Sequence, residues 1–255
     1  IFLKTSKIIF LKHNQAWSNY YNKCQMNKIK SISLMFPLYK DRNTVKLMIT
    51  KSSSVLRKLK IKYEIIIVDD GCPQNSGRLA KEIAKKFTNV KIFFHKKNLG
   101  YGAALKTGFR KFKNDWIFMI DGDNEYDVND LFRLVKASKN YDLVITYRYK
   151  KKYATSRIII SWMYNAILRL IFNIKFRDIS TGSRLVSRKL IKRIKLKSNS
   201  PFVGAELAIK AGLAGYKVGE IGIHTYPRTF GTGSSVSFKN ILLTLKDMFL
   251  LFMRI

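Results

Sequence analysis

Runs of apolar residues alternate with segments of helical spacing along the first two thirds of the chain. Each run is about four to eight residues long and is bounded by polar or turn residues, which is typical of strands buried on both faces of a parallel sheet. Strands that alternate with helices at this spacing indicate βαβ units, and hence an α/β fold with a mostly parallel sheet and helices on both faces. The predicted strands are 31–36 (closed by Pro37), 63–68, 90–94, 116–120 and 143–146, and the predicted helices are 41–59, 77–87, 98–112 and 128–137.

The last third of the chain has a different character. Residues 158–174 are mostly apolar and aromatic and are interrupted by Asn165 and Arg169, which favours a helix in the plane of a membrane interface; a core helix gives the same pattern. Residues 238–255 predict a final helix that either docks on a membrane or begins a longer hydrophobic region. The remaining predicted features are a polar loop entering a strand at 177–189, a helix at 201–215, a strand at 217–223 and a mobile lid at 226–235.

The charge of the chain limits its partners. It has 49 Lys and Arg residues against 16 Asp and Glu residues, a formal net charge of +33 at pH 7. Such a chain is attracted to nucleic acid, anionic lipid or phosphorylated ligands, although basic residues spread along a sequence also fit a solvated surface. Only Cys24 and Cys72 are present, so the sequence predicts no disulfide framework and a reducing compartment. We expect residues 1–27 to form a poorly structured extension, and no run of about 20 apolar residues predicts a membrane span.

Acidic residues directly follow the predicted strand 116–120. Asp121 and Asp123 are two residues apart, so their side chains point the same way at the end of the strand, where ligands of open α/β sheets bind. Two convergent carboxylates in so basic a chain favour a divalent cation whose shell is completed by substrate phosphates. The alternative is an acidic turn that caps the next helix, with Asp127 as its N-cap.

Other ligand motifs are incomplete. An EF-hand loop is excluded because Tyr126 and Phe132 stand where that loop needs Gly and Glu. Gly100 and Gly102 would suit a phosphate at a helix N-terminus, but the rest of a P-loop or dinucleotide-binding motif is missing. The histidines are scattered and no nucleophile elbow is present, which gives little support to a zinc site or a serine hydrolase.

In their order and spacing, these motifs resemble the family 2 glycosyltransferases of the GT-A (Rossmann-like) fold. The branch they resemble is that of the dolichol- or polyprenyl-phosphate mannose synthases and their glucose and N-acetylglucosamine relatives. The resemblance covers about residues 28–236 and implies one GT-A domain there, followed by an amphipathic helix at 237–255. It rests on L-M-F-P-L-Y at 34–39, V-D-D-G-C at 68–72, N-L-G-Y-G-A-A at 98–104 and D-G-D at 121–123.

The resemblance also implies a role for each site residue. The residues implied in binding the nucleotide sugar are Pro37, Tyr39, Asp69, Asp70, Gly100, Gly102, Asp121 and Arg228. Those implied in holding Mg²⁺ or Mn²⁺ are Asp121, Asp123 and Glu125, and those implied in binding an acceptor phosphate are Arg148, Arg157 and Ser161. Asp178 matches the acid before the family's T-G-F-R and joins Asp121, Asp123 and Arg228 as catalytic residues.

Three departures from the family pattern bear on these roles. Lys40-Asp41 stands where Asn-Glu is usual, Cys72 replaces Ser, and Ser183 replaces an aromatic residue. Ser183 bears on the donor-sugar pocket more than on the chemistry.

The acceptor-phosphate residues have an alternative explanation. Arg148, Arg157 and Ser161 also fit a solvated basic loop beside a helix start.

The predicted function is an inverting, metal-dependent hexosyltransferase. It would move a sugar from GDP-mannose, UDP-glucose or a similar donor to a polyprenyl phosphate on the cytoplasmic face of a membrane, to which it binds as a peripheral or monotopic protein. An acceptor phosphate is already an anionic nucleophile, so no serine–histidine relay is required. One alternative is a family 2 enzyme acting on a saccharide hydroxyl, with Asp178 as general base. A second is a basic nucleic-acid-binding module, although here the aromatic residues lie mostly inside apolar runs and not among exposed basic residues.

Overall fold

The computed structural model describes residues 29–149, 155–228 and 237–255, with the side chains of residues 155–157 left out. The predicted N-terminal extension and most of the predicted lid therefore lie outside the described residues. The strands are β1 (Ser31–Leu38), β2 (Lys62–Asp69), β3 (Val90–Phe94), β4 (Trp116–Met119), β5 (Leu143–Arg148), β6 (Arg184–Ser187) and β7 (Val218–Ile223). The helices are α2 (Val45–Lys58), α3 (Ser76–Ala84), α4 (Tyr101–Lys111), the 3₁₀ turn η1 (Val128–Asp130), α5 (Leu131–Ala137), α6 (Thr155–Phe172), α7 (Arg188–Arg193), α8 (Val203–Leu213) and α9 (Phe238–Phe252).

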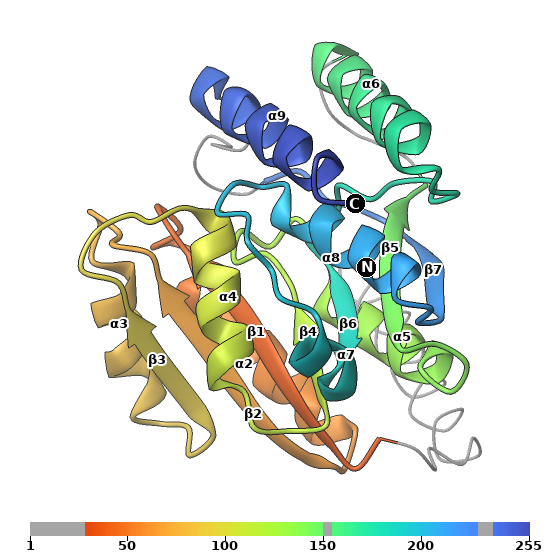
Figure 1. Ribbon diagram of the computed structural model, residues 1–255. Helices are drawn as coiled ribbons and strands as arrows, with labels where there is room; N and C mark the ends of the chain where they lie inside the picture. The colour runs from red at the N-terminus through yellow and green to blue at the C-terminus, as the bar shows by residue number, and fades with distance from the viewer. Residues whose placement is uncertain (1–28, 150–154, 229–236) are drawn as a thin grey trace, which may run out of the picture.

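The strands form one seven-stranded sheet in the order β3-β2-β1-β4-β6-β5-β7 (Figure 1). The pairs β1–β2, β1–β4, β2–β3 and β5–β7 are parallel, which confirms the predicted mostly parallel α/β sheet. Strand β6 runs antiparallel to both of its neighbours, β4 and β5. The carboxyl ends of β1, β2, β4 and β5 therefore meet at one edge of the sheet, where β6 begins.

Each face of the sheet carries its own hydrophobic core. Side chains of α2, α3 and α5 pack on one face, while those of α4, α7 and α8 pack on the other. Strand residues alternate between the two cores: Leu34 and Phe36 join the first and Met35 joins the second. Burial on both faces explains why the strands read as continuous apolar runs.

Pro37 does not end the first strand as predicted. Strand β1 continues to Leu38, and Pro37 pairs with Val68 of β2. Within β1, the N–H and C=O of Met35 face β4, and the ladder with β4 ends where Ile120 N–H donates to Met35 C=O at 3.0 Å. Pro37 faces the same side two residues later, so the N–H that proline lacks would have no ladder partner there.

Helices α6 and α9 lie at the upper end of the molecule in Figure 1, beyond the sheet. Only a few of their side chains are buried, among them Leu168 of α6 and Met248 and Leu251 of α9. None of the helices in the described ranges has the length and apolarity needed to cross a membrane.

Candidate functional site

The acidic segment after β4 folds into a turn at the carboxyl edge of the sheet. Asp121 Oδ1 accepts a 2.7 Å hydrogen bond from the hydroxyl of Tyr101 in α4. Burial and the neighbouring Asp123 raise the pKa of Asp121 to about 7. Burial and Glu125 likewise raise the pKa of Asp123 above its usual value. Burial is the larger cause of both pKa shifts, and repulsion between the neighbouring carboxylates adds to it, so positive charge near this turn would stabilise the ionised acids.

A single arginine from the segment after β7 faces this turn. Arg228 Nε donates to Glu125 Oε1 at 3.0 Å, and its Nη2 forms an ion pair with Asp123 Oδ2. The backbone holds the two segments together, because Tyr226 N–H donates to Glu125 C=O at 2.9 Å. The structure thus brings together the predicted Asp123, Glu125 and Arg228, while contact of Arg228 with a donor phosphate stays a prediction.

Asp41 is a further acid of this site, which the sequence suggested only as a departure from the family pattern. Burial and the charge of Asp123 raise the pKa of Asp41 to about 6. It follows β1, the parallel neighbour of β4, so the end of β1 brings it to the same edge as Asp123. That position in the predicted sheet is the signal that could have identified it.

The three predicted metal ligands do not face a common point. Within residues 29–149, 155–228 and 237–255, no group of three His, Cys, Asp or Glu side chains is arranged to hold a metal ion. Asp121 instead faces Tyr101, while Asp123 and Glu125 face Arg228. The donor set is still chemically suited to Mg²⁺ or Mn²⁺, because these cations prefer carboxylate oxygens and would offset the excess negative charge. The metal role of Asp121, Asp123 and Glu125 stays a prediction.

Gly182, in the loop before β6, packs directly on Asp121. A Cβ at position 182 would lie 1.9 Å from Asp121 Oδ2, so any other residue there would displace this carboxylate or the loop. Gly182 N–H also donates to the hydroxyl of Tyr126 at 3.1 Å. Neither Tyr101 nor Gly182 stood out in the sequence as a site residue, because both contacts join segments distant in sequence.

The buried side chain of Arg184 holds the loop before β6 through hydrogen bonds to its backbone carbonyls. This arginine is 2% exposed, and its Nη2 donates to the carbonyls of Thr181 at 2.6 Å and Ile179 at 2.9 Å. Ser183, the residue that replaces the family's aromatic side chain, is fully buried, and its hydroxyl has no hydrogen-bond partner in the described part of the chain. Ser183 therefore packs into the protein at this point.

The paired acids after β2 are bound within the protein. Asp69 caps the start of α3, since its carboxylate accepts from Cys72 N–H at 2.7 Å and Gly77 N–H at 2.6 Å. Asp70 accepts from Leu99 N–H and Gly100 N–H, both at 2.9 Å, and so ties the loop before α4 to the end of β2. Their predicted contacts with the nucleotide, like those of Pro37 and Tyr39, stay predictions.

Gly100, just before α4, and Gly102, in its first turn, have a packing role. Gly102 N–H donates to Asn199 C=O at 2.8 Å, and a Cβ at Gly100 would lie 2.8 Å from the same oxygen. Gly100 also has φ +96°, which favours glycine. Because the N–H groups of both glycines are used within the protein, this geometry does not support the predicted phosphate cradle at the N-terminus of α4.

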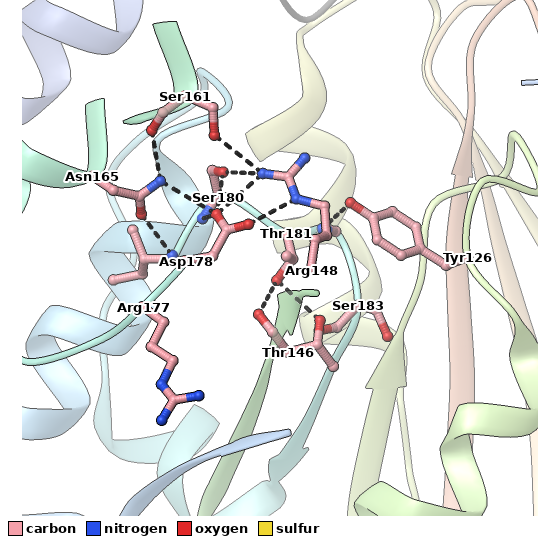
Figure 2. Close-up of polar contacts among 12 residues, drawn as sticks. Tyr126, Thr146, Arg148, Ser161, Asn165, Arg177, Asp178, Ser180, Thr181 and Ser183 are labelled. Carbon is pink, nitrogen blue, oxygen red and sulfur yellow. Dashed lines mark hydrogen bonds and ion pairs between the residues drawn. The ribbon is translucent and has the colours of Figure 1, made fainter. Parts of the chain in front are cut away.

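A second polar cluster lies at the end of β5 (Figure 2). Arg148 Nε donates to Asp178 Oδ2 at 2.7 Å, and Arg148 Nη2 donates to Asp178 Oδ1 at 3.1 Å. The same Nη2 reaches the hydroxyls of Ser180 at 2.7 Å and Ser161 at 3.3 Å. The structure therefore brings together Arg148 and Ser161, two of the residues implied in binding an acceptor phosphate, and it adds Asp178 and Ser180 to them; their role in binding phosphate stays a prediction. The side chain of Arg157 lies outside the described residues.

Asn165 joins helix α6 to this cluster. Its Nδ2 donates to Ser161 C=O at 2.7 Å and to Asp178 Oδ1 at 3.3 Å, while its Oδ1 accepts from Ile179 N–H at 2.9 Å (Figure 2). In the sequence, Asn165 was only an interruption of an apolar run. In the fold, it is the buried polar contact that fixes the helix at the polar cluster.

Comparison with known proteins decides the family. Residues 36–195 match the model of glycosyl transferase family 2, which is more than half of the chain. The chain belongs to glycosyl transferase family 2. Its membership confirms the predicted family.

Among curated proteins, this family 2 chain is similar to undecaprenyl-phosphate 4-deoxy-4-formamido-L-arabinose transferase of Yersinia enterocolitica. The two are 27% identical over 210 residues, which is 81% of this chain and 63% of the relative. The chain thus spans less than two thirds of that relative's length.

Solved structures confirm the GT-A fold. Glucosyl-3-phosphoglycerate synthase of Mycobacterium tuberculosis in complex with phosphoglyceric acid matches with a TM-score of 0.67 and 16% identity, covering 86% of this chain and 80% of that chain. The same enzyme with Mn²⁺, UDP-glucose and phosphoglyceric acid matches with a TM-score of 0.65 and 16% identity, covering 86% and 79%. Its complex with Mg²⁺ and UDP matches with a TM-score of 0.66 and 16% identity, covering 86% and 79%.

The raised pKa of Asp121 predicts that Asp121→Asn stabilises the protein at pH 8 in EDTA. Because the folded pKa of about 7 lies above the ordinary 3.8, the folded state binds more protons than the unfolded state between these values. Wild-type stability therefore falls as pH rises through this window, and neutral Asn avoids that loss. We expect a gain of about 1–2 kcal/mol in the free energy of unfolding at pH 8, shrinking by pH 5. Urea denaturation at both pH values measures it, and a less stable variant at pH 8 would contradict the prediction.

Proposed function

We propose that this family 2 glycosyltransferase moves a sugar from a nucleoside diphosphate to a polyprenyl phosphate. The main support for the proposal is that the polar cluster around Arg148 contacts helix α6, which exposes apolar side chains to solvent. Ser161 and Asn165 of α6 contact this cluster, while other side chains of the same helix are exposed and apolar. An acceptor with a phosphate head and a hydrocarbon tail needs this combination of a guanidinium and an adjoining apolar surface.

Helices α6 and α9 both present apolar side chains to solvent. Exposed apolar patches of this extent mark interaction sites, and amphipathic helices of this kind lie in membrane interfaces. We therefore place both helices against the membrane that holds the acceptor, as predicted for 158–174 and 237–255. The exposed apolar residues are Ile159, Ile160, Trp162, Met163, Ile167 and Leu170 on α6, and Phe238, Leu242, Leu243, Leu245, Phe249 and Phe252 on α9.

On the donor side, the proposal assigns the acidic turn to the diphosphate. Mg²⁺ or Mn²⁺ held by Asp121 and Asp123 would supply charge neutralisation for the departing nucleoside diphosphate. Tyr101 and Gly182 fix the Asp121 carboxylate, and the end of β4 directs Asp123 to the same edge. Arg228 is positioned to donate to phosphate oxygens, since its guanidinium already faces the turn.

On the acceptor side, the cluster favours a phosphate nucleophile over a hydroxyl. A hydroxyl acceptor needs a general base, and Asp178 is the candidate that the sequence offered. Both oxygens of Asp178 accept hydrogen bonds from Arg148, and Oδ1 also accepts from Ser180 at 2.6 Å. A carboxylate bound in this way positions the guanidinium more readily than it removes a proton. An anionic phosphate held beside Arg148 would attack the anomeric carbon directly, with inversion.

The experiment that tests the proposal is an assay of the purified chain in detergent. A panel of nucleotide sugars, including GDP-mannose and UDP-glucose, is incubated with undecaprenyl or dolichyl phosphate and Mg²⁺ or Mn²⁺. We expect at least one donor to give a lipid-extractable sugar product. Donor turnover that depends on an added saccharide, with no lipid product, would favour the hydroxyl-acceptor alternative.

The proposed membrane contact predicts that Trp162→Glu and Leu170→Glu weaken binding to anionic vesicles. These side chains are 65% and 86% exposed, so the folded state tolerates the change. Burying one such side chain in the interface contributes about 1.5–3 kcal/mol, which makes the expected loss roughly tenfold or more for each variant. Vesicle co-sedimentation measures it, with Leu213→Glu on α8, where Leu213 is 59% exposed, as the matched control. Equal loss in the control, or none in α6, would count against this surface.

A further inference from the structure

Arg228 occupies the carboxylates that the proposed function assigns to a cation. Its Nη2 is paired with Asp123 and its Nε with Glu125, so one guanidinium bridges both acids. The side chains of Asp123 and Glu125 are 7% and 4% exposed, against 23% for Arg228. A bridged, largely buried pair of this kind is stronger than an ion pair on the surface.

We propose that Arg228 and a divalent cation exclude each other from Asp123 and Glu125, so that the cation enters only together with a diphosphate that takes over the arginine. The inference rests on the proposed function only for the class of donor. It makes Arg228 the residue by which the site distinguishes a cation bound to a diphosphate from the free cation.

Arg228 stands where a cation would have to bind. The acids of the turn are not arranged to hold a metal within the described residues, because two of them are turned toward Arg228. For Asp123 to bind a cation, the guanidinium has to leave it. The two positive groups would otherwise stand at contact distance in a buried site, where like charges repel far more strongly than in water.

A displaced Arg228 needs another anionic partner. Four carboxylates belong to this site, those of Asp41, Asp121, Asp123 and Glu125, and Arg228 is paired with the last two. A divalent cation alone relieves that charge but leaves Arg228 beside a new positive centre. A diphosphate offers the guanidinium anionic oxygens of the geometry that arginine prefers. The cation and the diphosphate should therefore each raise the affinity for the other, as linkage requires.

The experiment measures Mn²⁺ binding alone, without any sugar transfer. Free Mn²⁺ is quantified by electron paramagnetic resonance during titration of the full chain, with and without GDP or UDP. The variants are Arg228→Gln, Arg228→Lys and the matched control Arg133→Gln, which removes an arginine from an ion pair with Asp130 in the helix that follows the turn. Thermal unfolding confirms that each variant is folded.

We expect Arg228→Gln to raise the Mn²⁺ affinity measured without nucleotide and to reduce the gain in Mn²⁺ affinity that a nucleotide gives. Without nucleotide, Arg228→Gln should bind Mn²⁺ about tenfold more tightly than wild type, equal to about 1.4 kcal/mol, and Arg133→Gln should match wild type. Arg228→Lys, which keeps the charge but cannot bridge both acids, should fall between. With GDP or UDP, the gain in Mn²⁺ affinity should be large in wild type and at least about threefold smaller in Arg228→Gln.

Three results would overturn the proposal. These are unchanged or weaker Mn²⁺ binding by Arg228→Gln without nucleotide, an equal nucleotide effect in wild type and Arg228→Gln, and no Mn²⁺ binding by any of the proteins. A failure of the proposed acceptor would leave the titration unaffected, since no acceptor is present. The two proposals therefore fail separately.

Discussion

Asp123→Asn should lower kcat by about 10³-fold while the protein stays folded. The substitution removes a buried carboxylate at the end of β4 and with it the negative charge that a cation on the donor diphosphate requires. Losing electrostatic stabilisation of a departing group typically costs about 10²–10³ in rate, and loss of the cation adds to this. The measurement is the initial rate of sugar transfer with excess Mn²⁺.

The matched control is Asp127→Asn, four residues further along the same acidic segment. Asp127 is the N-cap of η1, where its side chain accepts from Asn129 N–H at 2.9 Å, and Asn is an equally good N-cap. We expect nearly wild-type turnover from this control. If Asp123→Asn keeps full activity in EDTA, or if both variants lose activity equally, the acids serve the turn and not the chemistry.

Arg148→Gln should lower kcat/KM for polyprenyl phosphate, with little change in donor binding. The expected loss of transition-state stabilisation is about 2–4 kcal/mol. Arg148 is the guanidinium at the centre of the cluster, and its loss removes the charge that would hold the acceptor phosphate. Calorimetry with nucleotide sugar and Mn²⁺ separates donor affinity from acceptor use. Arg177→Gln is the control, because the side chain of Arg177 points away from the cluster (Figure 2). Arg177 donates instead to the hydroxyl of Tyr147.

Removing Arg148 alone takes away the guanidinium that pairs with the buried carboxylate of Asp178, which can itself destabilise the fold. The double variant Arg148→Gln/Asp178→Asn removes both charges and should recover stability without recovering acceptor use. If the double variant also recovers kcat/KM, the pair is structural and the acceptor phosphate binds elsewhere.

The strands were predictable from the sequence because burial on both faces makes them continuous apolar runs. Strand β3 has the predicted bounds, 90–94, and the others differ by a few residues at their ends. The antiparallel direction of β6 was not predictable, since it depends on pairing with β4 and β5, which lie far away in the chain. Helix α7 is also new: with six residues it is too short to show a helical period.

The site was predictable where its residues lie next to strand ends. Asp123 was identified in this way, whereas the role of Arg148 was implied by the family resemblance; the structure places both at the carboxyl edge of the sheet. Tyr101 and Gly182 were not predictable, because their roles depend on contacts with Asp121 across the fold. The glycines of the N-x-G-x-G motif suggested a phosphate site, whereas Gly102 in the fold accommodates the backbone of Asn199.

³¹P nuclear magnetic resonance of the complete reaction shows whether the acceptor is a phosphate monoester. The chain is incubated with its nucleotide sugar, Mn²⁺ and polyprenyl phosphate in detergent. We expect the monoester signal of polyprenyl phosphate to be replaced by a phosphodiester signal, in step with release of the nucleoside diphosphate. Release of the nucleoside diphosphate while the monoester signal stays unchanged would contradict it.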